Sequence, residues 1–341
     1  MKFLSKIISA TLCAFLFYSC QETKKPQTID YLNIQGEAQG TTYSITYKDS
    51  LSRNFKPSID SILKQIDLSV STYVDSSLIS KFNVLTDTVP FEIDQIFYDN
   101  LLVSSKVYEQ TNGIFDPTIT PLFKYYNFHN NDSLKIDSVQ VDSILRNHVG
   151  FSKLMFFTKN KTYFVKKQTP SIQLDFNAVA QGYSVDVIGA FLEKNGVKNF
   201  MVELGGEVLA KGKNPNRKTW NIGIEKPNFN SEKTDDAVSV VKLENKALAT
   251  SGSYRKFKEL NGKKYAHAIN PITGMPVSHS VLSVSVIANT CAEADAYATA
   301  FLILGKEASL NLIKKINLNV EVYFIETSEE GNFKEYKSEG F

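Results

Sequence analysis

Hydrophobic and polar residues recur along the chain with two different periods, which predict where strands and helices lie. Residues 43–47 (Tyr-Ser-Ile-Thr-Tyr) and 281–287 alternate with a period of two, as expected for strands. In residues 57–66 the apolar positions are instead three or four apart, which predicts an amphipathic helix. The same reasoning predicts further helices at 93–107, 137–147, 178–195, 291–304 and 306–316. It predicts further strands at 154–158, 163–167, 200–204, 220–225, 238–243 and 320–325.

Helices and strands are mixed along the chain without a repeat, a low-complexity tract or a change of composition that would mark a domain boundary. Two polar segments, 127–138 and 228–236, are predicted to be surface loops. A chain of 341 residues, 43% of them hydrophobic, can build the core of one or two domains. The mixed order favours an α+β (mixed α/β) fold in a single compact domain, which we place at residues 31–341.

The first 19 residues have the composition of a targeting segment. Two lysines give a positive start, and the largely apolar run that follows is too short to span a membrane. Ser19 followed by Cys20 resembles the end of a lipoprotein signal, in which Cys20 becomes the lipidated N-terminus. We therefore expect a signal peptide at 1–19 and a lipidated tether at 20–30, which would hold the protein on a membrane surface. Simple secretion without a lipid would also fit this segment.

Charge and cysteine content exclude several classes of partner and fold. Loss of Lys2 and Lys6 with the signal would leave 36 basic and 36 acidic side chains, which argues against nucleic acid or an anionic surface as the main partner. Cys13 would leave with the signal and Cys20 would be acylated, so Cys291 is the only remaining thiol. A disulfide framework is therefore excluded, and the exported protein must depend on its hydrophobic core.

The predicted helix at 291–304, which ends at Gly305, carries a pair of oxygen-bearing side chains. Asp295 and Thr299 are four positions apart and so lie on one face of the helix. A carboxylate and a hydroxyl placed in this way can supply two ligands to Mg²⁺, which completes its octahedron with water and phosphate oxygens. The plainer interpretation of the pair alone is that Asp295 is a solvated surface residue.

Several other short stretches combine turn residues with chemically useful side chains, which is where sites tend to lie. They are Gln39-Gly40-Thr41, Ser71-Thr72-Tyr73, Phe115-Asp116-Pro117-Thr118, 175–183, 203–207, Thr250-Ser251-Gly252 and 267–274. We expect 175–183 to join a strand to a helix, where backbone N–H groups can face an anion. Taken singly, Tyr73 could be an ordinary surface ring and His267 a structurally satisfied histidine. The sequence has no Rossmann or Walker glycine motif, no Gly-x-Ser-x-Gly elbow and no Cys/His cluster, which disfavours those nucleotide-binding folds, hydrolases and zinc sites.

In this order, the stretches resemble the ApbE family of FAD:protein FMN transferases, from about Gln39 to Gly305. The resemblance is specific because seven separated motifs recur in sequence order. It implies a single-chain fold related to the T-fold, with FAD as the substrate and Mg²⁺ at its pyrophosphate. It implies that Asp295, Thr299 and the carbonyl oxygen of Ala178 bind the metal. The residues that it implies for FAD binding are Gln39, Thr41, Tyr73, Phe115, Asp116, Asp175, Gln181, Ser251, Gly252, His267 and Ile269.

The resemblance also implies a reaction and a location. The FMN half of FAD would be transferred to a Thr or Ser hydroxyl of a partner protein, and AMP would be released. Tyr73 would stack on a flat ring of FAD, and His267 or Asp295 would remove the proton of the hydroxyl. The acceptor would carry an FMN-binding domain in a membrane redox complex. The enzyme itself would be exported, lipid-anchored to a bacterial membrane and facing the periplasm.

Two departures from the family pattern leave more than one function open. Asn177-Ala178 stands where the family often has Gly-Gly, and Gln181 stands where it often has Lys. Gln181 can donate a hydrogen bond to a phosphate but cannot neutralise its charge. With water as the nucleophile, the same site would be a Mg²⁺-dependent FAD pyrophosphatase that gives FMN and AMP. Two non-catalytic functions also stay open: a lipoprotein that stores FAD, supported only by Gln181, and a structural surface lipoprotein without flavin.

Overall fold

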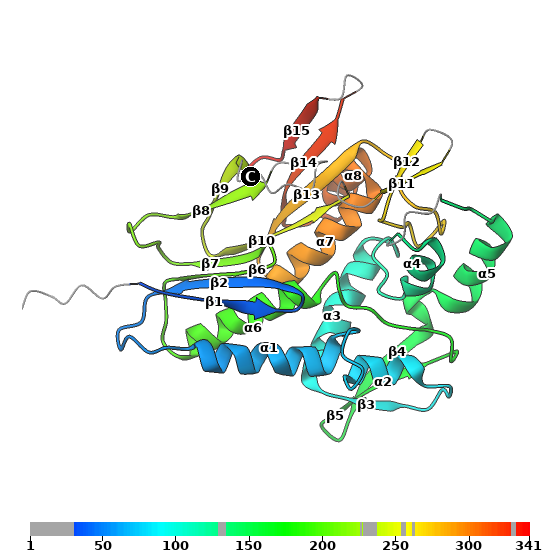
Figure 1. Ribbon diagram of the computed structural model, residues 1–341, viewed down its shortest axis with the longest axis horizontal. Coiled ribbons are helices and arrows are strands. Elements are labelled where there is room, and N and C mark those ends of the chain that lie inside the picture. Colours follow the sequence, from blue (N-terminus) through cyan, green and yellow to red (C-terminus); the bar gives the residue numbers. More distant parts are fainter. Residues whose placement is uncertain are drawn as a thin grey trace, which may run out of the picture.

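The computed structural model describes residues 31–128, 134–225, 227, 237–253, 257–260, 263–328 and 332–341 (Figure 1). The predicted signal peptide, the tether with Cys20, residues 129–133 of the first predicted surface loop and all of the second one, 228–236, lie outside these residues. Within the described ranges, no helix is long and apolar enough to cross a bilayer. Helices and antiparallel strands are mixed in one unit, which confirms the predicted α+β (mixed α/β) fold.

An antiparallel sheet of eight strands forms the centre of the molecule, in the order β1-β2-β6-β7-β10-β13-β14-β15. These strands are β1 (Leu32–Ala38), β2 (Thr41–Tyr47), β6 (Phe200–Leu204), β7 (Glu207–Lys211), β10 (Lys246–Gly252), β13 (Val281–Ala288), β14 (Glu321–Thr327) and β15 (Phe333–Lys337). The hairpin of β8 (Trp220–Glu225) and β9 (Ala237–Leu243) packs on one face of this sheet. Helices cover the other face, so the middle strands are buried on both sides (Figure 1).

The helices and the remaining strands surround this sheet. The helices are α1 (Lys56–Val70), α2 (Leu78–Val84), α3 (Gln95–Gln110), α4 (Thr120–Tyr126), α5 (Ser138–His148), α6 (Ala180–Lys194), α7 (Cys291–Leu304) and α8 (Lys306–Ile316). A three-stranded sheet contains β3 (Phe91–Ile93), β5 (Thr162–Lys167) and β4 (Leu154–Lys159), and a hairpin contains β11 (Phe257–Leu260) and β12 (Lys263–Ala266). In Figure 1, α1 and α3 lie on the side of α6 and α7 that faces away from the sheet.

Strand β13 is buried along its whole length, although its sequence alternates between apolar residues and serine. Alternation usually indicates that the polar face is solvated, but Ser283 and Ser285 are buried here because elements cover both faces of the sheet. The Ser285 hydroxyl lies 2.8 Å from the Thr250 hydroxyl on the neighbouring strand β10. The buried polar atom therefore has a cross-strand partner, as buried hydroxyls usually do.

Helix α7 is the most deeply buried helix, since only Glu293, Thr299 and Leu304 of its residues are even partly exposed. Alanine alternates with larger residues along it, and these small side chains allow the sheet and α6 to approach closely. A helix that is apolar around its whole circumference is expected in a core rather than on a surface. The helix that carries Asp295 thus lies at the centre of the largest hydrophobic cluster.

The structure contains every predicted helix and every strand predicted from the hydrophobic periodicity, with ends that differ by a few residues. Sequence reasoning missed short or weakly patterned elements, namely β1, β3, β7, β10, β11, β12, β15, α2 and α4. Strand β10 is rich in Ala, Ser and Gly, which are poor strand formers, and it is a strand because β7 and β13 pair with it on both sides. We also expected a strand directly before Asp175. This prediction is wrong, because that segment is irregular.

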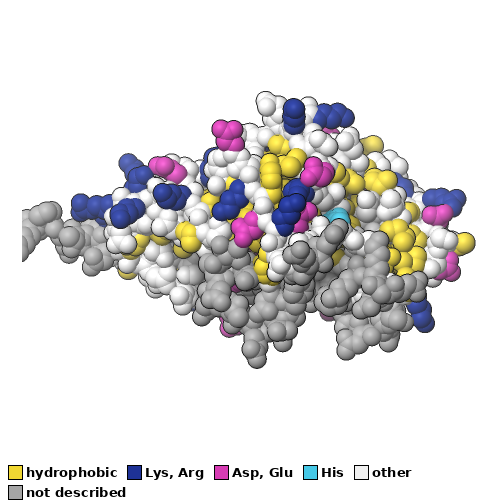
Figure 2. All heavy atoms as spheres, turned by 90° about the horizontal axis from the view of Figure 1, so that it is seen from above, with side chains coloured by type: hydrophobic (Ala, Val, Ile, Leu, Met, Phe, Trp, Pro, Cys, Tyr) yellow, Lys and Arg dark blue, Asp and Glu magenta, His cyan; other side chains and the backbone are white. Residues whose placement is uncertain are grey.

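Charged side chains are mixed on the face that Figure 2 shows, where Lys and Arg lie among Asp and Glu. Short salt bridges pair some of the charges of the chain, such as that between Lys306 Nζ and Glu326 Oε2 at 2.5 Å. Opposite charges that lie close together weaken each other's field at a distance.

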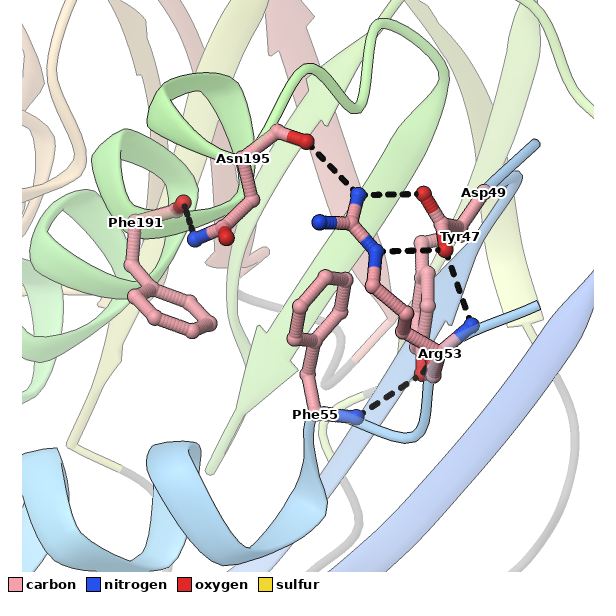
Figure 3. Close-up of polar contacts among 6 residues, drawn as sticks. All are labelled: Tyr47, Asp49, Arg53, Phe55, Phe191 and Asn195. Atoms are coloured by element: carbon pink, nitrogen blue, oxygen red, sulfur yellow. Dashed lines mark hydrogen bonds and ion pairs between the residues drawn. The ribbon is translucent and has the colours of Figure 1, made fainter. Parts of the chain in front are cut away.

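A partly buried ion pair joins the end of β2 to the end of α6 (Figure 3). Arg53 donates from Nη2 to Asp49 Oδ1 (2.6 Å) and from Nε to Asp49 Oδ2 (2.9 Å). The same Nη2 donates to the carbonyl oxygen of Asn195 (2.7 Å), so a positive charge lies at the C-terminus of α6, where the helix dipole favours it. The hydrogen bonds from Arg53 lower the pKa of Asp49 to about 2. The loop between β2 and α1 is thereby fixed to α6.

We predict that Asp49→Asn lowers the free energy of unfolding at pH 7 by about 1–2 kcal/mol. This is the contribution expected of a hydrogen-bonded charge pair when the partial exposure of Arg53 is taken into account. Because the pKa of Asp49 is depressed in the folded state, the stabilisation is complete above about pH 4 and is lost as the pH falls towards 2. The difference between wild type and variant should therefore narrow below pH 4 in urea titrations. Asp142→Asn is the matched control, since Asp142 pairs with Arg146 at the same spacing but is exposed; an equal effect of both substitutions would contradict the prediction.

Candidate active site

Helix α7 presents the carboxylate of Asp295 and the hydroxyl of Thr299 one turn apart. Asp295 is only 7% exposed, so the interpretation of this residue as a solvated surface aspartate is wrong. Its Oδ2 accepts a hydrogen bond from the backbone N–H of Gly182 near the start of α6 (3.3 Å). The Thr299 hydroxyl lies 3.0 Å from the hydroxyl of Ser251 near the end of β10. Three elements therefore bring the expected site residues Ser251, Asp295 and Thr299 close to the start of α6.

Helices α6 and α7 approach each other closely at Gly182. A Cβ atom at this position would lie 2.4 Å from the carbonyl oxygen of Cys291, which is closer than atoms can pack. One turn further along α6, the Asp186 carboxylate accepts hydrogen bonds from the N–H groups of Cys291 (2.8 Å) and Ala292 (2.9 Å). Asp186 thus satisfies backbone donors in the first turn of α7, as a capping residue does. These contacts fix the position of Asp295 relative to the start of α6.

The carboxylates around this contact are strongly desolvated. Burial raises the pKa of Asp295 to about 7, and burial raises the pKa of Asp186 to about 6. Glu207, the first residue of β7, is also buried, and both burial and the nearby charge of Asp295 raise its pKa. Within the described part of the chain, neither Asp295 nor Glu207 has a Lys or Arg within salt-bridge distance. Ionised carboxylates in such a place require a positive partner.

The donor set fits a hard divalent cation. Asp295 offers a carboxylate, Thr299 a hydroxyl and Ala178 a backbone carbonyl, and Mg²⁺ prefers oxygen ligands of these kinds. Only one of these three ligands is an acidic side chain. Among the described residues, no group of three or more His, Cys, Asp or Glu is arranged to hold a metal. A cation here would supply the positive charge that the buried carboxylate otherwise lacks.

The turn between β1 and β2 meets the start of α6. Gln39 has a left-handed backbone (φ 52°), and its Nε2 donates to the Ser184 hydroxyl (2.7 Å), while its Oε1 is buried without a hydrogen-bond partner among the described residues. A Cβ atom at Gly205 would lie 2.9 Å from Thr41 Cγ2 and 3.1 Å from Gln181 Nε2. The expected FAD-binding residues Gln39, Thr41 and Gln181 therefore lie where the β1–β2 turn and Gly205 meet the start of α6.

Tyr73 lies on the open side of the segment that leads into α6. Its ring is 83% exposed, and its hydroxyl accepts a hydrogen bond from Asn177 Nδ2 (3.4 Å). The backbone N–H of Asn177 donates to Asp175 Oδ1 (2.9 Å), which orders this loop. An aromatic ring that is exposed but held at its hydroxyl is available for stacking on a planar ligand.

The side chains of Phe115 and Asp116 hold a neighbouring loop in place. The Phe115 ring is part of the core, and Asp116 Oδ1 accepts from both the N–H (2.8 Å) and the hydroxyl (2.6 Å) of Thr118. Asp116 Oδ2 accepts from the N–H of Phe151 (3.1 Å). The N–H of Asp175 donates to the carbonyl oxygen of Pro117 (2.8 Å), which joins this loop to the segment before α6.

The 267–274 segment and the Asp116 loop border the same cavity. Gly113, Asp116, Pro271 and Ile272 are among the residues that line this open cavity of about 280 Å³. Ile269 is buried and forms an isolated bridge with Pro276, and His267, just after β12, is half-buried. The cavity thus brings the Asp116 loop and part of the 267–274 segment together.

Sequence reasoning did not assign a role to Asp186 or Glu207. Asp186 is a polar residue within the helix predicted at 178–195, where nothing in the spacing distinguishes it from a surface residue. Glu207 follows the Gly-Gly turn, and an acidic residue directly after such a turn was the one available signal. Cys20, the expected lipidation site, lies outside the described residues.

Comparisons with known proteins give a consistent result. The sequence model of the ApbE family matches residues 39–324. The FAD:protein FMN transferase of Haemophilus influenzae is 33% identical over 338 residues, covering 97% of this chain and 95% of that protein. The FAD:protein FMN transferase of Escherichia coli (strain K12) is 29% identical over 340 residues, with coverages of 97% and 95%.

Solved structures agree with the sequence matches. The flavin transferase ApbE from Vibrio cholerae superposes with a TM-score of 0.78 at 29% identity, covering 92% of this chain and 98% of that chain. The apo form of the Pseudomonas stutzeri flavinyl transferase ApbE gives a TM-score of 0.80 at 27% identity, covering 91% and 95%. The similarity therefore extends over nearly all of each molecule.

We predict that Gly182→Ala lowers the free energy of unfolding by at least about 2–3 kcal/mol, because its methyl group would collide with backbone that cannot rotate away. Gly189→Ala, also in α6, is the control, because its Cβ would meet the Leu209 Cδ2 atom, which belongs to a side chain that can rotate. Alanine is also a better helix former by about 1 kcal/mol, so this control should change stability by less than about 1 kcal/mol. Urea unfolding of both variants tests the difference, and equal destabilisation would contradict the assignment of the close contact to Gly182.

Proposed function

The chain belongs to the ApbE family, and on this premise we propose that it is a Mg²⁺-dependent FAD:protein FMN transferase that modifies a Thr or Ser hydroxyl and releases AMP. Membership makes the chain an enzyme that uses FAD as its substrate and a protein as its acceptor. The observation that carries the finer proposal is the buried carboxylate of Asp295, which has no cationic side-chain partner among the described residues and lies beside Thr299 and the start of α6.

The metal would be held by Asp295, Thr299 and the carbonyl oxygen of Ala178. When bound, Mg²⁺ would neutralise pyrophosphate charge and stabilise the AMP leaving group. The protein contributes mainly positioning and charge complementarity, because phosphoryl transfer has a loose transition state. The close contact at Gly182 holds Asp295 in place before the substrate arrives, so little reorganisation is needed.

The start of α6 would receive phosphate oxygens. Val179, its N-cap residue, makes no side-chain capping hydrogen bond, and the carboxylate of Asp295 already accepts from the N–H of Gly182 in its first turn. Helix N-termini of this kind favour anions. Gln181 adds a neutral amide donor at the same end, which positions a phosphate without neutralising it.

Tyr73 and His267 would act on the two reacting partners. The exposed Tyr73 ring would stack on a planar ring of FAD and help to hold the phosphorus in line with the acceptor hydroxyl. The proton of that hydroxyl needs an acceptor within hydrogen-bond distance. Asp295 would be a poor base while it binds the metal, so we assign this role to His267.

We also propose that the enzyme is exported, lipid-anchored at Cys20 and faces the periplasm, where its acceptor is an FMN-binding domain of a membrane redox complex. The signal-like sequence of residues 1–19 supports export. The position of β1 supports an N-terminal tether, because β1 is an edge strand and the chain therefore enters the fold at its periphery.

The direct test is to incubate the chain from Gln21 onward with FAD, Mg²⁺ and an FMN-binding acceptor domain, and to measure the mass of the acceptor. We expect a gain equal to one FMN, which disappears without Mg²⁺ or when the acceptor Thr is changed to Ala. Free FMN and AMP beside an unmodified acceptor would indicate a pyrophosphatase instead. Intact bound FAD would indicate storage, and no flavin binding would indicate a structural lipoprotein.

We predict that Asp295→Ala reduces the rate of FMN transfer by about 10²–10³-fold, the usual effect of removing one electrostatic contact to the reacting group. Glu293→Gln on the same helix is the control, because Glu293 is partly exposed and pairs with Lys106. Its rate should match that of the wild type. Full transfer activity of Asp295→Ala in Mg²⁺ would refute the metal assignment.

We predict that Tyr73→Ala weakens FAD binding by roughly 10-fold, because stacking on an aromatic side chain is worth about 1–3 kcal/mol. The exposure of the ring means that the free energy of unfolding should change by less than about 0.5 kcal/mol. Titration of FAD fluorescence measures the affinity. Tyr73→Phe keeps the ring and should bind FAD as the wild type does; equal weakening in both variants would mean that the hydroxyl, not the ring, holds the ligand.

A further inference from the structure

Glu207 is fixed in position by a tight turn. It pairs with Leu204 at the end of the β6–β7 hairpin, and the two residues between them, Gly205 (φ 65°) and Gly206 (φ 107°), have positive φ angles that favour glycine. The side chain of Glu207 is 6% exposed and therefore points into the protein. Its location is thus determined by the backbone of the hairpin.

One oxygen of the Glu207 carboxylate is buried and has no hydrogen-bond partner among the described residues, namely Oε2. Glu203, on the other strand of the same hairpin, differs, because its Oε1 accepts a hydrogen bond from the N–H of Gly206 (2.9 Å). Buried polar atoms are nearly always paired, and an exception in a folded protein indicates strain, a functional role, or a water molecule or ion at the site. The unpaired atom of Glu207 is such an exception.

The unpaired oxygen faces the candidate active site. It lies 3.3 Å from the position that a Cβ atom of Gly205 would occupy, and Thr41 Cγ2 and Gln181 Nε2 lie within 3.1 Å of that same point. Strand β7, which carries Glu207, packs against α7, which carries Asp295, and the negative charge of Asp295 acts on the Glu207 carboxylate. Glu207 therefore lies next to the expected FAD-binding side chains Thr41 and Gln181, and close enough to the expected metal ligand Asp295 for the two charges to interact.

Two carboxylates buried near each other oppose each other's ionisation, and no cationic side chain among the described residues pairs with either of them. Gln181, whose amide lies near the unpaired oxygen, is neutral. A divalent cation changes the sign of this interaction, because it attracts both carboxylates at once. The unpaired oxygen can then accept a bond from the ion or from a water molecule in its coordination shell.

We propose that Glu207 is a second acidic partner of the cation at Asp295, and that it raises the affinity of the site for a divalent ion. This inference deepens the proposed function and rests on its metal assignment. The site would then have two carboxylates, Asp295 on α7 and Glu207 on β7, instead of Asp295 alone.

The test compares Glu207→Gln with wild type in the full-length protein, using Mn²⁺ as the probe and electron paramagnetic resonance to measure free Mn²⁺. We expect the dissociation constant to rise about 10–100-fold, the usual effect of losing such a partner. Without metal, the thermal midpoint of the variant should equal or exceed that of the wild type, because one of two repelling buried charges is gone. Glu203→Gln is the matched control and should leave the Mn²⁺ affinity unchanged.

The outcomes separate this inference from the proposed function. If wild type binds no Mn²⁺, the metal assignment itself is overturned, and the inference with it. If wild type and Glu207→Gln bind Mn²⁺ equally, only the role of Glu207 is overturned. A lower midpoint without metal, together with unchanged affinity, would make Glu207 purely structural. Should Glu207→Gln not fold, Glu207→Met keeps the length of the side chain without a charge or a polar oxygen, and an Mn²⁺ affinity equal to that of the wild type in that variant would overturn the inference.

Discussion

The contact between α6 and α7 at Gly182 determines the arrangement of the whole site. At this point the two helices touch through backbone atoms, with no side chain between them. The N–H of Gly182 binds Asp295, and Asp186 binds the first turn of α7, so the two helices are joined by three hydrogen bonds as well as by packing. Any residue that separated these helices would displace Asp295 from the start of α6, where we propose that the phosphates bind.

Much of the fold could be predicted from the sequence, because amphipathic periodicity is a local property. The helices at 57–66 and 178–195 were visible in the spacing of their apolar residues. Strands β7 and β10 were not, since their existence depends on pairing with neighbours that are distant in sequence. Burial of both faces of β13 was likewise hidden, because alternation alone does not reveal the β8–β9 hairpin that covers one side of the sheet.

The candidate site was predictable to a similar degree. Asp295 and Thr299 were identified from helical spacing, and the uniformly apolar residues around them contained the signal that Asp295 is buried. Ordered motifs identified the FAD-binding residues through resemblance rather than geometry. Glu207 could not be identified as a partner of Asp295, because only the packing of β7 against α7 brings the two together. The Ser285 hydroxyl is buried and has a hydrogen-bond partner, whereas Glu207 Oε2 is buried and has none among the described residues. This contrast distinguishes a structural polar group from a candidate functional one.

The burial of α7 has a consequence for how this enzyme can change over evolutionary time. Most positions of α7 serve the core, and Asp295 and Thr299 serve the proposed reaction on the same helix, so a substitution there risks both folding and chemistry. Tyr73 is exposed and lies outside the core, so a substitution there does not put folding at risk as well. Adaptation to new acceptor proteins is therefore expected to accumulate in the peripheral segments around Tyr73, while α7 tolerates few replacements.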